Sequence, residues 1–255
     1  MPKSEKNFIG IYFSTSYCVI VSLNIKKEMQ TITIWIIFFA LMLLSFIVSR
    51  ALQSYFNKCA KILTNEGITG REVAEKMLYD NGIYDVKVVS TGGSLTDHYN
   101  PADKTINLSY EVYNGNSVTA AAVAAHETGH AVQHAHSYIW LSLRSKLVPA
   151  VSFASRWVQW ILLAGMLLVN IFPHLLLVGI VLFALTTLFS FITLPVEINA
   201  SRRALVWMNS SNITTSQTHP KAEKCLRMAA YTYVIAALSS LATLLYYVLI
   251  YSRRS

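Results

Sequence analysis

The sequence has few charged residues for its length. Asp, Glu, Lys and Arg make up 13% of the 255 residues, whereas soluble domains usually carry about a quarter. Three long stretches have no charge at all, namely 29–49, 157–196 and 228–252. A spanning helix needs about 20 apolar residues, so the first and third stretches fit one span each and the second fits two. The shortage of charge therefore predicts a mainly α-helical integral membrane protein with about four transmembrane helices.

Cysteine is also scarce, and its spacing excludes two classes of site. The sequence has 3 cysteines, Cys18, Cys59 and Cys225, and they lie far apart. An odd number of widely separated cysteines predicts neither a disulfide framework nor a CxxC site for metal or redox chemistry.

Basic segments interleaved with aromatic residues, which would indicate nucleic-acid binding, are absent although the formal net charge is +8. The Lys and Arg residues instead flank the apolar stretches. These flanking residues are Arg50, Lys58, Arg144, Lys146, Arg156, Arg202, Arg203, Lys224 and Arg227. Such placement is typical of chains oriented in a lipid bilayer, so we expect the bilayer, and no nucleic acid, as a partner.

The longest uncharged stretch predicts a transmembrane hairpin over 157–194. Asn170 and Pro173 in its middle suit a tight turn between two helices. We expect these helices at about 157–172 and 175–194.

Residues 1–28 precede the first predicted span, and translation can begin either at Met1 or at Met29. Residues 8–23 are apolar but include several Ser and Thr residues, so they fit a signal-like or anchoring segment better than a span. Lys26-Lys27-Glu28 would be encoded by a purine-rich stretch, which resembles a bacterial ribosome-binding site directly before Met29. Translation from Met29 would leave 1–28 as an untranslated extension, and peptides from 4–27 in the native protein would exclude that start.

The polar segment 50–156 predicts a small folded domain. Thr69 and Glu72 have the spacing of a capping box, which predicts a helix over 68–83. Strands are predicted at 86–90, 92–99 and 104–109, the last two joined by a turn at Asn100-Pro101.

An alanine-rich helix capped by Ser117 is predicted over 117–136, and it carries the pattern His126-Glu127-x-x-His130. Residues four apart share one face of a helix, so the two histidines can bind one metal ion. Glu127 lies about 100° round the helix, where it can take a proton from a water molecule activated by the metal. The pattern fixes only three residues, so a helix with surface histidines is the alternative.

Catalytic zinc usually has three protein ligands, and three residues compete for the third position. His134 lies on the same helix about 12 Å above His126, which is too far for one tetrahedron. His136 has the spacing of HExxHxxGxxH peptidases, but Gln133 replaces the glycine at which their chain turns.

Glu197 is the third candidate. It is the only acidic residue between Glu127 and Glu223, and a lone carboxylate at a membrane edge is costly unless it is paired or binds a metal. The alternative is a salt bridge from Glu197 to Arg202 or Arg203.

The segment 195–227 is expected to hold the helix that carries Glu197 and a connection to the last span. We expect this helix to begin at Pro195. Two spans separate His130 from Glu197, so the chain returns to the same face of the bilayer.

Four segments, "SLTDHY", "AAHETGHAVQH", "LPVEINASRRAL" and "AAYTYVIAAL", resemble in order those of the neutral zinc metallopeptidases of bacterial membranes, the YugP-type family. The resemblance covers about residues 29–251. It implies a membrane-bound zinc metallopeptidase with a small α+β, zincin-like catalytic domain that contains a short β-sheet. The metal would be held by His126, His130 and Glu197, with Glu127 as the general base.

A more distant similarity links "EINASRRA" to the E-x-x-A-D-R segment of integral-membrane peptidases that include the prenyl-protein proteases. It implies Arg202 in the place of an arginine near the site. Ser201 stands where that group has an acid, which normally orients the first histidine. Either Ser201 makes a weaker hydrogen bond to that histidine, or another group takes this role.

Three further residues are candidates for binding substrate or an oxyanion: His98, Tyr99 and Tyr233. Ordinary packing within a strand or a helix is the alternative for each.

The main hypothesis is therefore a zinc-dependent peptidase that acts on peptide or membrane-protein substrates. A non-catalytic zinc-binding membrane adaptor or regulatory protein is the second. A metal transporter is weaker, because His126 and His130 lie outside the spans. Lys and Arg are more frequent beside the polar domain than at the termini, so the positive-inside rule places that domain in the cytoplasm, at the bacterial inner membrane.

Overall fold

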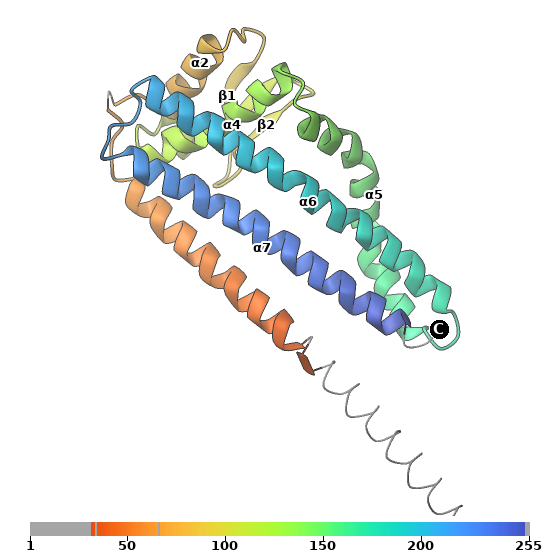
Figure 1. Ribbon diagram of the computed structural model, residues 1–255. Helices are drawn as coiled ribbons and strands as arrows, with labels where there is room; N and C mark the ends of the chain where they lie inside the picture. Colours follow the sequence, from red (N-terminus) through yellow and green to blue (C-terminus); the bar gives the residue numbers. More distant parts are fainter. Residues whose placement is uncertain (1–31, 34, 66, 253–255) are drawn as a thin grey trace, which may run out of the picture.

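The computed structural model describes residues 32–33, 35–65 and 67–252 (Figure 1). The hypotheses about residues 1–28 lie outside the described residues. Among those described, four helices are long and apolar enough to cross a membrane. They are Trp35–Cys59, α5 (Ile139–Leu167), α6 (Pro173–Ser210) and α7 (His219–Ser252). The predicted class, a mainly α-helical integral membrane protein, is confirmed.

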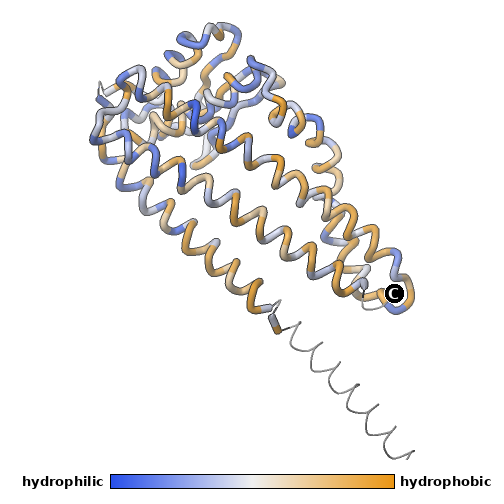
Figure 2. The backbone as a smooth tube through the Cα atoms, in the orientation of Figure 1, coloured by the Kyte–Doolittle hydropathy of each residue, from blue (hydrophilic) through white to orange (hydrophobic). Residues whose placement is uncertain are grey.

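Hydrophilic residues gather at the end of the molecule where α2 and the strands lie, and hydrophobic residues follow the long helices away from it (Figure 2). The elements of this polar end are α2 (Gly70–Asp80), β1 (Lys87–Thr91), β2 (His98–Asn100), β3 (Thr105–Ser109), α3 (Tyr110–Asn114) and α4 (Val118–Ala135).

Both predicted helix caps are present. Thr69 and Glu72 form the capping box of α2, in which the Glu72 carboxylate accepts a hydrogen bond from the Thr69 backbone N–H at 2.7 Å. Ser117 caps α4 by accepting a hydrogen bond from the Ala120 N–H at 3.2 Å. These caps satisfy N–H groups that a helix start leaves without an intrahelical partner.

The sheet in the described part of the chain has the order β1-β3-β2. β1 pairs with β3 in parallel, and β2 pairs with β3 antiparallel after the predicted turn at Asn100-Pro101. The prediction of a strand over 92–99 is wrong for all but its last two residues. Gly93 and Leu95 have φ angles of 97° and 59°, which an extended strand does not allow.

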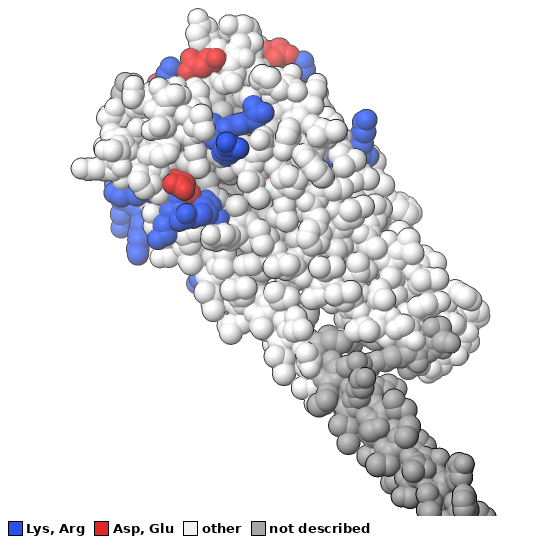
Figure 3. All heavy atoms as spheres, viewed as in Figure 1, with Lys and Arg blue, Asp and Glu red and all other residues white. Residues whose placement is uncertain are grey.

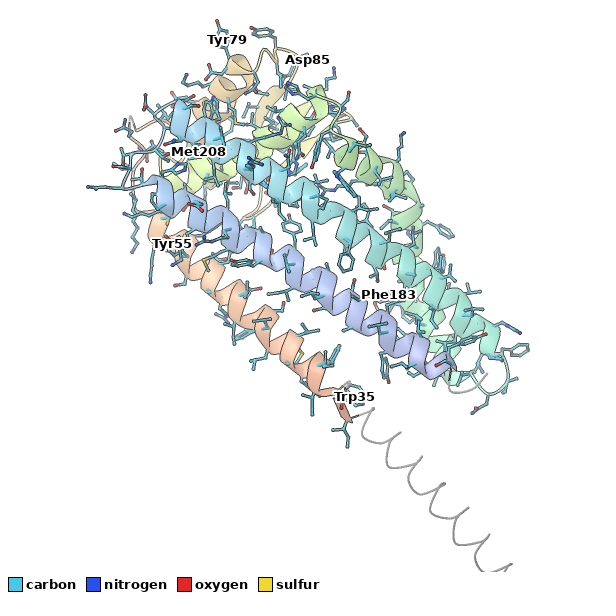
Figure 4. All side chains as sticks on the ribbon, viewed as in Figure 1. Trp35, Tyr55, Tyr79, Asp85, Phe183 and Met208 are labelled. Carbon is cyan, nitrogen blue, oxygen red and sulfur yellow. The ribbon has the colours of Figure 1, made fainter. Side chains whose placement is uncertain are left out.

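The core of the polar end lies between α2, α4, the sheet and the last turns of α6. Its fully buried side chains include Met77, Ile106, Val118 and Met208. Figure 4 shows Met208 at this end of α6 and Phe183 far along the same helix, among the apolar spans. α6 therefore forms part of both the polar end and the bundle of apolar helices, and connects the two.

α5 and α6 form a closely packed hairpin whose connection spans 168–172. A Cβ added to Gly165 would lie 2.7 Å from the Leu176 Cα, so only glycine allows this approach beside the turn. α5 begins at Ile139, earlier than the predicted 157, and so its first turns extend beyond the uncharged stretch.

The expectation of a new helix at Pro195 is wrong, because α6 continues through it from Pro173 to Ser210. A proline inside a helix removes one backbone hydrogen bond and usually breaks the helix. Membrane helices tolerate it where neighbouring helices and Ser or Thr side chains stabilise the backbone. α6 packs against α4, α5 and α7.

Candidate functional site

Three side chains predicted to hold a metal meet where α4 lies against α6 (Figure 1). α4 carries His126 and His130, and α6 carries Glu197. Their ligand atoms all lie within 4.8 Å of one another, and the described residues hold no other such group of His, Cys, Asp and Glu. Oε2 of Glu197 lies 3.2 Å from Nε2 of His126 and 3.5 Å from Nε2 of His130.

The close approach of the two helices depends on the glycine within HETGH. A Cβ added to Gly129 would lie 2.7 Å from the Ala200 carbonyl oxygen. Any side chain at this position would therefore push α6 away from α4 and move Glu197 with it. The glycine sits between the two histidines of the motif and so allows the carboxylate of a distant segment to reach them.

Burial of these three polar side chains is unfavourable unless each of them has a hydrogen-bonding, charged or metal partner. Glu197 is 3% exposed and His130 is 7% exposed, and a buried carboxylate without partners is strongly unfavourable. Two imidazoles and one carboxylate around an open position are a donor set that suits zinc. The residues therefore fit the metal that the motif predicts.

His130 is oriented by Gln133, a residue that the sequence analysis discussed only for its lack of a turn. The Gln133 Nε2 donates to the Val196 carbonyl at 2.8 Å and to Asn199 Oδ1 at 3.0 Å. Its Oε1, 3.1 Å from His130 Nδ1, must then accept the proton that Nδ1 carries. This leaves the Nε2 lone pair of His130 facing Glu197, ready to bind a metal.

His126 has Ser201 as its partner, which is the first of the two alternatives that the sequence left open. The Ser201 hydroxyl lies 3.0 Å from Nδ1 of His126. Each histidine thus has a hydrogen-bonding partner at Nδ1 and presents Nε2 to the carboxylate. The partner of His126 comes from α6, whereas the partner of His130 comes from α4.

The arginine that contacts Glu197 is Arg144 of α5, which the sequence analysis did not single out. Its Nη1 lies 3.0 Å from Oε1 of Glu197. The alternative salt bridges to Arg202 or Arg203 are wrong: Arg202 is exposed, and Arg203 donates to Asn199 at 2.8 Å. Arg144 lies 53 residues from Glu197 in the sequence and in no recognisable motif, so no local signal points to it.

Glu127 is half-buried beside the cluster and contacts the edge of the sheet. Its Oε2 accepts a hydrogen bond from the Tyr99 backbone N–H of β2 at 3.1 Å. Burial opposes the charged form of His130, but the nearby carboxylates of Glu197 and Glu127 outweigh it and raise the pKa of His130.

The other histidines of the motif region lie outside the cluster. Nδ1 of His134 is 2.8 Å from the Tyr99 hydroxyl. His136 is the exposed C-cap of α4, and its Nδ1 lies 2.8 Å from the Val132 carbonyl. His98 is exposed and contacts the Thr96 carbonyl at 2.7 Å. Neither His134 nor His136 therefore reaches the position of a third ligand.

A cavity of about 210 Å³ opens beside the cluster. His126, Glu197 and Ser201 line it together with Tyr233 of α7 and Phe56 of the helix Trp35–Cys59. The predicted candidate Tyr233 thus lies next to the predicted metal ligands. The cavity is walled by both the polar end and the long helices.

Comparisons with known proteins agree with this geometry. Residues 34–252 match the family described as "Putative neutral zinc metallopeptidase". The chain is 44% identical over 208 residues to the "Putative membrane protease YugP" of Bacillus subtilis (strain 168), which covers 82% of this chain and 92% of that protein. No solved structure matches the chain. The resemblance inferred from the four motifs is confirmed, and the chain belongs to the "Putative neutral zinc metallopeptidase" family.

Proposed function

We propose that this protein is a membrane-bound endopeptidase that uses zinc held by His126, His130 and Glu197. The observation that carries the proposal is the meeting of these three side chains, with both Nε2 atoms directed at one carboxylate oxygen. Glu197 comes from beyond the α5–α6 hairpin, so a chance histidine pair on α4 does not account for the arrangement.

Glu127 is the general base in this proposal. When bound, zinc supplies the positive charge that lowers the pKa of a water molecule and polarises a scissile carbonyl. Glu127 takes the proton from that water and returns it to the leaving amine. Its Oε2 is fixed by the Tyr99 N–H, which leaves Oε1 for the proton transfer.

The remaining residues orient the ligands and exclude water. Gln133 and Ser201 hold the two imidazoles with Nε2 directed at the site. Arg144 engages Oε1 of Glu197 and leaves Oε2 toward the histidines. Burial of the carboxylate keeps bulk water from competing for these contacts.

The proposal also includes location and substrate. We place the polar end in the cytoplasm of a bacterial cell and the long helices in its inner membrane, because Lys and Arg concentrate where the spans meet the polar end. The cavity beside the ligands is walled partly by membrane helices. Peptides or membrane-protein segments close to the bilayer surface are therefore the proposed substrates.

The decisive test replaces Glu127 by Gln in the full-length protein. Zinc content is measured by mass spectrometry, and cleavage is measured on an unfolded protein and on a panel of membrane proteins in vesicles. The proposal expects a zinc content equal to that of wild type and at least about a hundredfold less cleavage.

Glu75→Gln, an exposed exchange on α2, is the matched control and should leave zinc content and cleavage unchanged. Undiminished cleavage by Glu127→Gln, or a wild-type protein that binds no zinc, would contradict the proposal. Zinc binding without cleavage by any form would favour the adaptor hypothesis.

A further inference from the structure

A second cavity lies between α6 and α7, where the apolar spans meet the polar end. Its volume is about 680 Å³, which is within the range of small-molecule sites. α6 lines it with Ile198 and Arg202, and α7 lines it with Arg227, Tyr231 and Val234. We call this cavity the α6–α7 groove.

On both walls of the groove an arginine is followed by apolar residues in the direction away from the polar end, and on α6 the apolar Leu205 and Val206 also line the groove on the other side of Arg202. Residues four apart share a helix face, so Arg202 lies one turn closer to the polar end than Ile198. Arg227 likewise lies one turn closer to the polar end than Tyr231 and two turns closer than Val234. An uncharged stretch begins directly after Arg227, which places this arginine at the depth of lipid headgroups.

The positive charge in the groove is only partly neutralised. No ion pair within the described part of the chain involves Arg202. Arg227 lies 3.8 Å from Glu223, and both side chains are about half exposed, so this pair is weak. His219, which also lines the groove, contacts the Thr214 hydroxyl. Figure 3 shows Lys and Arg gathered near the polar end, with an uncharged surface over the long helices.

We propose that the α6–α7 groove binds an anionic phospholipid. The phosphate lies between Arg202 and Arg227, and an acyl chain follows the apolar surface past Ile198 and Val234. Arginines at the membrane boundary between helices are suited to anionic headgroups. A soluble phosphate would contact only the arginines of the groove, and an apolar helix would contact only its apolar residues. A phospholipid matches both.

The groove adjoins the metal-site cavity without being part of it. Ser201, Leu226 and Ala230 line both, so a lipid in the groove would lie behind the serine that orients His126. Lipid binding requires neither zinc nor proteolysis, and its test is independent of the proposed peptidase function.

The test is native mass spectrometry of the full-length protein released from neutral detergent with added lipid. Phosphatidylglycerol is compared with phosphatidylcholine of the same acyl chains. The wild type is expected to prefer the anionic lipid, and the double variant Arg202→Gln/Arg227→Gln should bind it about thirtyfold more weakly, because each arginine near the phosphate contributes about a factor of five. Arg202→Lys, which keeps the charge, should retain most of the binding.

Two controls separate the groove from general electrostatic attraction. Arg71→Gln/Arg156→Gln removes the same charge from α2 and α5, outside the groove, and should bind phosphatidylglycerol as the wild type does. Val234→Trp fills the apolar part and should weaken lipid binding while the arginines remain.

Four results would overturn the proposal. These are equal binding of both lipids, equal loss in the control double variant, unchanged binding by Val234→Trp, and displacement of the lipid by an equal concentration of glycerol phosphate.

Discussion

Two helix contacts of the molecule, one at the candidate site and one among the apolar spans, differ sharply in how closely they pack. α4 and α6 leave no room for a Cβ at Gly129, and together they carry all three proposed ligands. The helix Trp35–Cys59 instead faces α7 across an apolar cavity of about 590 Å³, and the most apolar segment of that helix has no buried residue. The comparison indicates that the site geometry depends on one tight contact, while the first helix forms an outer wall that membrane lipid can also cover.

The largest effect is expected from breaking the tight contact. Gly129→Val would force α6 away from α4 and should destabilise the protein by about 3 kcal/mol or displace the ligands, because overpacking against backbone is costly. Thermal unfolding in detergent and zinc content measure the two effects. Gly92→Ala is the control, since a Cβ there meets open space. Wild-type stability and zinc content in Gly129→Val would show that the contact is not required.

A smaller effect is expected from removing the hydrogen bonds between the same helices. Gln133→Leu leaves the Val196 carbonyl and His130 Nδ1 without this partner. Loss of a group that orients a ligating histidine typically weakens metal binding about 10- to 100-fold. Competition with a zinc chelator measures the affinity, with the exposed Gln53→Leu as control. Equal zinc affinities in both variants would contradict the assigned role of Gln133.

A pH-dependent effect is expected where α2 contacts α6. Burial favours the neutral form of Asp80, but hydrogen bonds from Trp207 and Lys76 outweigh it and lower the pKa of Asp80. Because the folded-state pKa is below the unfolded value of about 3.9, this stabilisation is present above that value and is lost as pH falls through the folded-state pKa.

The stability difference between wild type and Asp80→Asn should therefore shrink as pH is lowered from about 6 to about 3. Thermal unfolding across this range tests it, with the exposed Glu111→Gln as control. A difference that stays constant with pH would rule out the proposed contribution.

The smallest effect is expected from a substitution in the helix Trp35–Cys59, which packs loosely against α7. Phe38 lines the apolar cavity and is 44% exposed, so Phe38→Ala should cost less than about 1 kcal/mol, because lipid is as apolar as the side chains it replaces. Met77→Ala in the hydrophobic core of the polar end should cost about 2–5 kcal/mol. Unfolding temperatures of the two variants in the same detergent give the comparison. A greater loss from Phe38→Ala would show that the first helix is tightly packed after all.

Most of the architecture could be predicted from sequence because its signals are local. Uncharged stretches indicate spans directly, and the capping box of Thr69 and Glu72 fixes the start of α2. The strand expected over 92–99 failed because Gly93 and Leu95 adopt positive φ angles. The Gly92-Gly93 pair is a turn signal, whereas no residue preference indicates the angle at Leu95. Pro195 was misread because packing around α6 overrides the local tendency of proline to end a helix.

At the site, the motif and the single acidic residue of its region were enough to suggest His126, His130 and Glu197. The motif position of Ser201 left its role open, because the wider group has an acid there. The contact of Arg144 with Glu197 and the contacts of Gln133 with α6 could not be predicted, because they join segments more than 50 residues apart. Such contacts exist only after the helices pack, and they leave no periodicity in the sequence.

The most direct test of the account is the zinc content of purified protein with Glu197→Gln, compared with His136→Ala and wild type. The account predicts about one zinc ion per chain in wild type and His136→Ala, and at least about tenfold less in Glu197→Gln. Full zinc content in Glu197→Gln, or loss of zinc in His136→Ala, would contradict the assignment of the carboxylate on α6 as the third ligand.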